Sequence, residues 1–173
     1  GVIYGPISPI YGFGAVLMVL GLCRKKRPDW QTFLYGALIG GSFEYLISFL
    51  QETFLGTVSW DYTNELLNIN GRTTIPFMIV WGLLAVVLVK IFYPTLSNII
   101  ESLPEKFGKV VTWILIVLLF FDFAISWGAL VRQMFRHNGY PPLTIVGDFF
   151  DEHYPDEVLK ESYTNMVIIE VEK

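Results

Sequence analysis

Long runs of apolar residues alternate along the chain with short polar segments. Four of these runs approach or reach the roughly 20 helical residues that cross a hydrocarbon core of about 30 Å. They extend from about 7 to 23, 30 to 54, 75 to 93 and 110 to 131, and the first is short and rich in glycine. The pattern therefore predicts an all-α fold, a polytopic transmembrane bundle of about four helices.

The segments outside these runs are shorter and more polar. Residues 94–104 have prolines at both ends and predict a short amphipathic helix on the membrane surface. After residue 137 the chain becomes acidic, and Pro155 followed by two acids is typical of the first turn of a helix. The end, 167–173, is compatible with a strand or a frayed terminus. We expect two parts, a bundle over 1–137 and a C-terminal tail over 138–173.

Composition narrows the kinds of binding and catalytic chemistry that are expected of this protein. Of 173 residues, 53% are hydrophobic and only 16% are charged, and the net charge is −4, so a nucleic-acid surface is not expected. The single Cys23 excludes an internal disulfide and a multi-cysteine metal centre. His137 and His153 are sixteen residues apart, which matches no metal-binding spacing. We expect neither a metal nor another cofactor.

Basic residues in the short loops predict the orientation in the membrane. Six of them lie within the segments 24–29 and 94–109, and only Arg72, Arg132 and Arg136 lie in the short segments on the opposite side. The positive-inside rule then places loops 24–29 and 94–109 in the cytoplasm. Loop 55–74 and the acidic tail are expected to be outside.

Two acids lie inside the apolar runs, where a charge costs about 3 kcal/mol on insertion scales and marks a candidate functional site. Glu44 is 14 residues beyond Trp30 and Asp122 is 13 beyond Lys109. These separations correspond to depths of roughly 21 and 20 Å, and Tyr11 reaches nearly the same layer. Small and polar residues at every fourth position predict that Glu44 faces another helix; these are Gly36, Gly40, Glu44, Ser48 and Glu52.

Three roles remain open for the two acids. Their role could be limited to holding helices together. As a facing pair, they could instead relay protons or bind a cation. Alternatively Arg72, which follows an Asn70–Gly71 turn, could neutralise them.

The outer segment 60–72 is dense in aromatic, amide and charged residues. Its aromatic residues could form an ordinary interfacial belt. Alternatively the loop re-enters the membrane and lowers polar side chains onto the Glu44 layer, which requires protein or water around its backbone. The candidate polar pocket comprises Tyr11, Glu44, Trp60, Asp61, Asn68, Asn70, Arg72 and Asp122.

The chain contains five short motifs. The first combines 4–6 with 9–14, and the others are 43–45, 60–62, 68–72 and 154–157. In this combination the chain resembles a family of small bacterial integral membrane proteins, found largely in Firmicutes, that are described as ABC-transporter permeases of "type IV". The resemblance extends from Gly5 to about Asn165. It implies a location in the bacterial plasma membrane and one further helix upstream of Tyr4.

A permease role implies partners. The sequence contains no Gly-x-x-x-x-Gly-Lys-Ser/Thr loop, so an ABC ATPase subunit would bind the nucleotide. Four helices are few for a translocation path, which implies a homo- or hetero-oligomer surrounded by membrane lipids. One alternative is an intramembrane enzyme that uses a carboxylate, or a lipid-binding protein, acting at the outer leaflet. A second alternative is an accessory subunit without catalytic activity.

Overall fold

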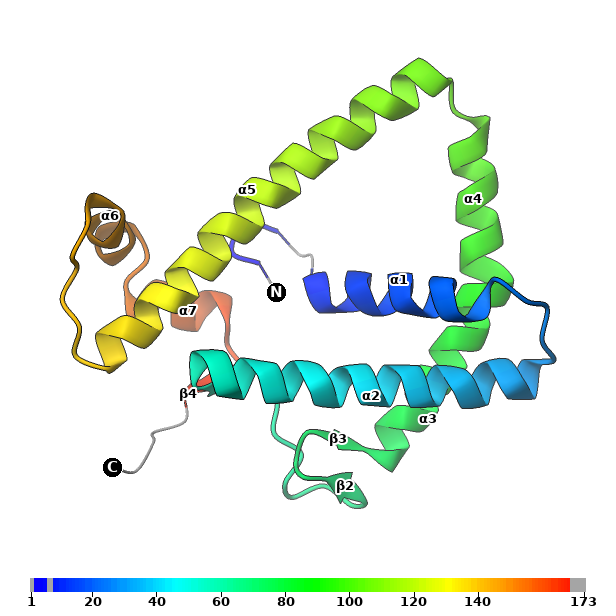
Figure 1. Ribbon diagram of the computed structural model, residues 1–173, viewed down its shortest axis with the longest axis horizontal. Helices are drawn as coiled ribbons and strands as arrows, with labels where there is room; N and C mark the ends of the chain where they lie inside the picture. The colour runs from blue at the N-terminus through cyan, green and yellow to red at the C-terminus, as the bar shows by residue number, and fades with distance from the viewer. Residues whose placement is uncertain (1, 6–7, 169–173) are drawn as a thin grey trace. The chain divides into compact units, whose positions relative to one another are not determined.

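The computed structural model describes residues 2–5 and 8–168, and it is predominantly helical (Figure 1). The helices are α1 (Pro9–Leu22), α2 (Asp29–Leu55), α3 (Ile75–Val87), α4 (Tyr93–Ser102), α5 (Glu105–His137), α6 (Ile145–His153) and α7 (Asp156–Ser162). Four strands of two residues each form two small antiparallel sheets. The predicted all-α membrane fold is confirmed.

Three helical segments are long and apolar enough to cross a membrane. They are Asp29–Leu55, Ile75–Ser102 and Glu105–His137. The first apolar run forms α1, which has only 14 residues. Three spans are thus supported by length and composition, and the fourth stays a prediction.

The third span is longer than the sequence predicted. A π-helical turn (Leu88–Phe92) joins α3 to α4 without a break, so 94–102 continues the third helix and is not part of a loop. Tyr93 N–H donates to the carbonyl of Leu88, five residues earlier, directly before Pro94, which has no N–H of its own. The predicted loop at 94–109 is therefore reduced to Leu103 and Pro104, between α4 and α5.

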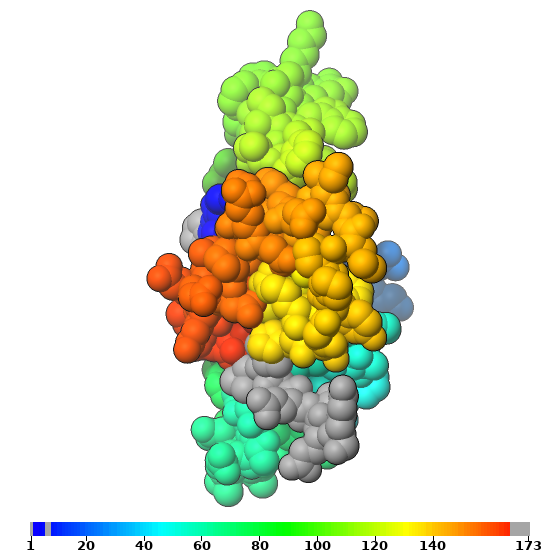
Figure 2. Space-filling model, turned by 90° about the vertical axis from the view of Figure 1, so that its left-hand side faces the viewer, coloured from blue at the N-terminus to red at the C-terminus, as the bar shows by residue number. Residues whose placement is uncertain are grey.

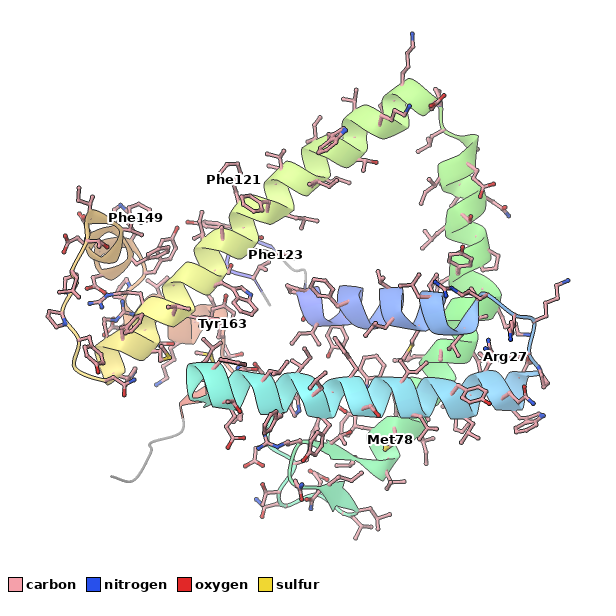
Figure 3. All side chains as sticks on the ribbon, in the orientation of Figure 1. Arg27, Met78, Phe121, Phe123, Phe149 and Tyr163 are labelled. Atoms are coloured by element: carbon pink, nitrogen blue, oxygen red, sulfur yellow. The ribbon has the colours of Figure 1, made fainter. Side chains whose placement is uncertain are left out.

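The chain divides into two compact units, of which the larger contains 9–49 and 61–111. Here α2 and α3 pack closely because small residues face the partner helix. A Cβ added to Gly36 would lie 2.1 Å from Cβ of Ala85, and one added to Gly41 would lie 2.5 Å from Cγ of Met78 (Figure 3). Met18, Leu22 and Ala85 form the core. This unit holds the polar contacts described below.

The second unit contains the described residues up to Ser8, together with 50–60 and 112–168. Its strands β1 (Thr57–Val58) and β4 (Val167–Ile168) pair antiparallel. Helix α7 follows Pro155 as predicted, whereas α6 was not predicted, although Thr144 caps it by accepting a hydrogen bond from Gly147 N–H. The orange residues of α6 lie against the yellow end of α5 (Figure 2). Of the predicted strand or frayed end, residues 169–173 lie outside the described residues.

Candidate functional site

Glu44 is a buried carboxylate in the middle of α2, with 8% of its surface exposed. Each of its oxygens accepts a hydrogen bond from a different hydroxyl. Tyr62 donates to Oε1 at 3.1 Å, and Thr73 donates to Oε2 at 2.7 Å. Both donors belong to the segment between α2 and α3, so this segment is folded over the carboxylate.

A hairpin sets the position of Thr73. Strands β2 (Asn68–Ile69) and β3 (Thr73–Thr74) pair antiparallel across a turn in which Asn70 and Gly71 have positive φ angles of 53° and 67°. Asn-Gly is the preferred dipeptide for such a turn. Thr74 then caps α3 by accepting a hydrogen bond from Phe77 N–H at 3.1 Å. The turn and the cap together fix Thr73, which is 2% exposed, against α2.

The two hydrogen bonds that hold the Glu44 carboxylate both come from uncharged hydroxyls. An ionisable side chain within a membrane span is costly to bury and marks a candidate site for a solute or an ion. The Tyr62 phenol responds to the same surroundings: burial, and then the negative charge of Glu44, raise the pKa of Tyr62 above its ordinary value. This phenol therefore remains a hydrogen-bond donor to the carboxylate at neutral pH.

Aromatic rings lie around the Glu44 side of α2. The indole of Trp81 covers Gly40, one helical turn before Glu44. Tyr11 lies 6.1 Å from Trp81 between ring centroids, and Tyr62 stacks on Phe77 at 4.8 Å. Tyr11 remains 66% exposed. Of these rings, Tyr62 contacts the Glu44 carboxylate directly, and a carboxylate beside an aromatic ring is chemically suited to a positively charged group.

Arg72 and Asn70 contact the next residue of α2. The guanidinium of Arg72 lies 5.8 Å from the ring centroid of Tyr45 and 5.4 Å from that of Phe49. Asn70 Nδ2 donates to the Tyr45 hydroxyl at 2.9 Å. Both predicted residues therefore attach the loop between α2 and α3 to Tyr45, which follows Glu44 in the sequence.

Asn68 and Asp61 shape the loop itself. Asn68 Nδ2 donates to the carbonyls of Thr63 and Glu65, and its Oδ1 accepts from Gly71 N–H at 3.0 Å. The hydroxyl and then the N–H of Thr63 donate to Asp61, which lowers the pKa of that carboxyl. These two predicted site residues are exposed and hold the loop conformation.

Asp122 and Trp60 belong to the other compact unit. Asp122 Oδ1 accepts from Ser126 Oγ and from Tyr4 N–H, each at 3.3 Å. The backbone N–H of Ile3 donates to Ser126 Oγ at 3.0 Å. Asp122 thus ties the start of the chain to α5, and its grouping with Glu44 stays a prediction.

Sequence reasoning did not select Tyr62 and Thr73, the two residues that hydrogen-bond Glu44. The signals were present. Tyr62 lies inside the aromatic segment 60–62, and Thr73 precedes a threonine at the capping position of a helix with proline in its first turn. In the part of the chain that the structure describes, no group of three or more His, Cys, Asp or Glu side chains could hold a metal ion.

Comparisons with known proteins support one family. The model of the family described as "Putative ABC-transporter type IV" matches residues 1–127, well over half of the chain. No curated protein and no solved structure matches the chain.

Proposed function

The chain belongs to the family described as "Putative ABC-transporter type IV", and on this basis we propose that it is a membrane-spanning, permease-type subunit of an ABC transporter. It would lie in the bacterial plasma membrane, with its loop 55–74 and its tail outside. A separate ATPase subunit would supply the energy of ATP hydrolysis. A second copy or another permease subunit would complete the translocation path.

The observation that carries a solute-handling role is the buried Glu44 carboxylate. It is 8% exposed, and the hydroxyls of Tyr62 and Thr73 hold its two oxygens. A purely structural helix contact needs no ionisable group, and such groups in membrane spans mark substrate or proton pathways. The outward-facing polar pocket would be formed around Glu44, with Tyr62 and Thr73 on its outer side.

The surface proposed for the ATPase is α4. Its apolar side presents Ile99 and Ile100, which are 53% and 64% exposed, and Leu103 directly after the helix is 40% exposed. Helical spacing places Asn98 on the opposite side. A short amphipathic helix at the cytoplasmic end of a membrane span is suited to bind a soluble partner through its apolar side.

Copurification tests this role. The tagged chain is extracted from its native membrane in lipid nanodiscs, and the associated proteins are identified by mass spectrometry. An ABC ATPase should copurify with the wild type and with Asn98→Asp, and should be reduced at least tenfold with Ile100→Glu. If no ATPase copurifies, the permease role is wrong. If a lipid binds to the wild type but not to Glu44→Gln, an outer-leaflet enzyme or lipid-binding protein is favoured.

A further inference from the structure

Helices α6 and α7 pack back onto the last third of α5. The ring of Phe150 covers Gly128 so closely that an added Cβ would lie 2.4 Å from its Cζ. Leu159 of α7 and Ala129 of α5 are both fully buried in one cluster. Gly128 and Ala129 lie before Val131, where the fourth apolar run ends. The tail therefore contacts α5 at residues that are predicted to lie within the membrane.

Ion pairs fix α6 in this place. Arg132 of α5 donates twice to Asp151 of α6, at 2.8 Å from Nε and 2.7 Å from Nη2. Arg136 also donates to Asp151, at 2.7 Å, and to Asp156 at 2.6 Å. The inner side of α6 is thus bound to α5 through both packing and charge.

The opposite edge of α6, together with the preceding Leu143, is apolar and exposed, although the ring of Phe149 also stacks on His153. Leu143, Ile145 and Val146 are 85%, 88% and 62% exposed, and Phe149 is 43% exposed. Asp148 follows Val146 by two residues, which is about 200° around the helix. Asp148 therefore lies on the side of α6 opposite Val146, whereas the exposed Glu152, seven residues after Ile145, borders the apolar edge.

Exposed aromatic residues of α5 lie near the same end of this helix. On α5, Phe120, Phe121 and Trp127 are 66%, 59% and 61% exposed, as expected for a span in contact with acyl chains. Figure 3 shows Phe121 on this helix. Phe150 places α6 beside Gly128, next to Trp127 in the sequence. Tyr140, 58% exposed, precedes the patch and suits the headgroup level.

We propose that α6 is an interfacial helix whose apolar edge, Leu143, Ile145, Val146 and Phe149, lies in the bilayer surface at the C-terminal end of α5. Asp148 would point toward water. The tail would then lie on the membrane surface against the end of α5 and would not extend freely into water. This inference does not depend on the transport role.

Site-directed spin labelling tests the proposal in the full chain. Cys23 is replaced by serine, and a nitroxide is attached at Val146→Cys or, as the matched control, at Asp148→Cys on the same helix. In nanodiscs of phosphatidylcholine and phosphatidylglycerol, collisions with oxygen report lipid and collisions with a water-soluble nickel chelate report water. We expect the oxygen-to-nickel collision ratio to be at least threefold higher at position 146 than at 148.

Two results would overturn the proposal. Equal ratios at the two positions would place the apolar edge in water. A label at 146 that is shielded from both reagents would show that a protein, such as a second copy of the chain, covers the edge. Since both side chains are exposed, neither label is expected to disturb folding, and equal elution and thermal melting of the two variants check this.

Discussion

Thr73 Oγ1 donates a 2.7 Å hydrogen bond to Glu44 Oε2, and this contact joins the residue before the α3 cap to a carboxylate 29 positions earlier in α2. Both residues are buried. The loop between α2 and α3 is thereby attached at the ionisable group in the middle of α2. The same loop attaches a second time through the Tyr62 hydroxyl.

Thr73→Val should lower the free energy of unfolding by about 0.5–2 kcal/mol, because valine keeps the shape but removes the donor to Glu44. Thr73→Ser, which retains the hydroxyl, should cost less. Unfolding in mixed micelles titrated with a denaturing detergent measures both. A valine variant as stable as the wild type would mean that this hydrogen bond contributes nothing to stability.

Gly36→Ala should destabilise the chain by about 1–3 kcal/mol, since the new methyl would lie 2.1 Å from Cβ of Ala85 and force α2 and α3 apart. Gly12→Ala in α1 is the matched control, because nothing lies within 4 Å of its added Cβ. Thermal melting in detergent compares them. Equal melting temperatures would contradict the close approach of α2 and α3.

Because of Asp151, the contact between the tail and α5 should become less stable at acid pH. Hydrogen bonds from Arg132, and then from Arg136, lower the pKa of Asp151 from 3.8 to about 2. Because the folded-state pKa is depressed, the stabilisation is present above pH 4 and is lost as the pH falls toward 2. Proteolysis of the tail measures this stability.

At pH 7, Asp151→Asn should weaken the contact by about 1–2 kcal/mol, between the values for exposed and buried ion pairs. The difference from the wild type should shrink as the pH falls from 4 to 2. Asp148→Asn, on the exposed side of α6, should behave like the wild type. A constant difference between wild type and Asp151→Asn at all pH values would show that the ion pair is not its source.

The sequence was most informative about the helices that bury one side. Small residues at every fourth position predicted that α2 faces another helix, and Gly36 and Gly40 indeed lie against α3. Hydrophobic runs also located the long spans, since their length and composition are properties of the local chain. The Asn70–Gly71 turn was also predictable, because the preference of Asn-Gly for a tight turn is a property of the local chain.

Long-range partners could not be predicted in the same way. The choice of Thr73 and Tyr62 as the donors to Glu44 depends on how the loop folds back, which no periodicity encodes. Continuation of the third span through Pro94 depends on a π-helical turn, whereas proline normally indicates the end of a helix. The docking of α6 through Asp151 likewise joins residues far apart in sequence.

The central claim is that Glu44 contacts the solute of an ABC permease. Mass spectrometry of the complex released from native-lipid nanodiscs tests this claim most directly. The account predicts that an ATPase subunit accompanies both the wild type and Glu44→Gln. It also predicts that a bound small molecule is present with the wild type and at least tenfold reduced with Glu44→Gln. Equal occupancy in the two proteins, with the ATPase present, would contradict the role of Glu44, and the absence of any ATPase would contradict the permease assignment.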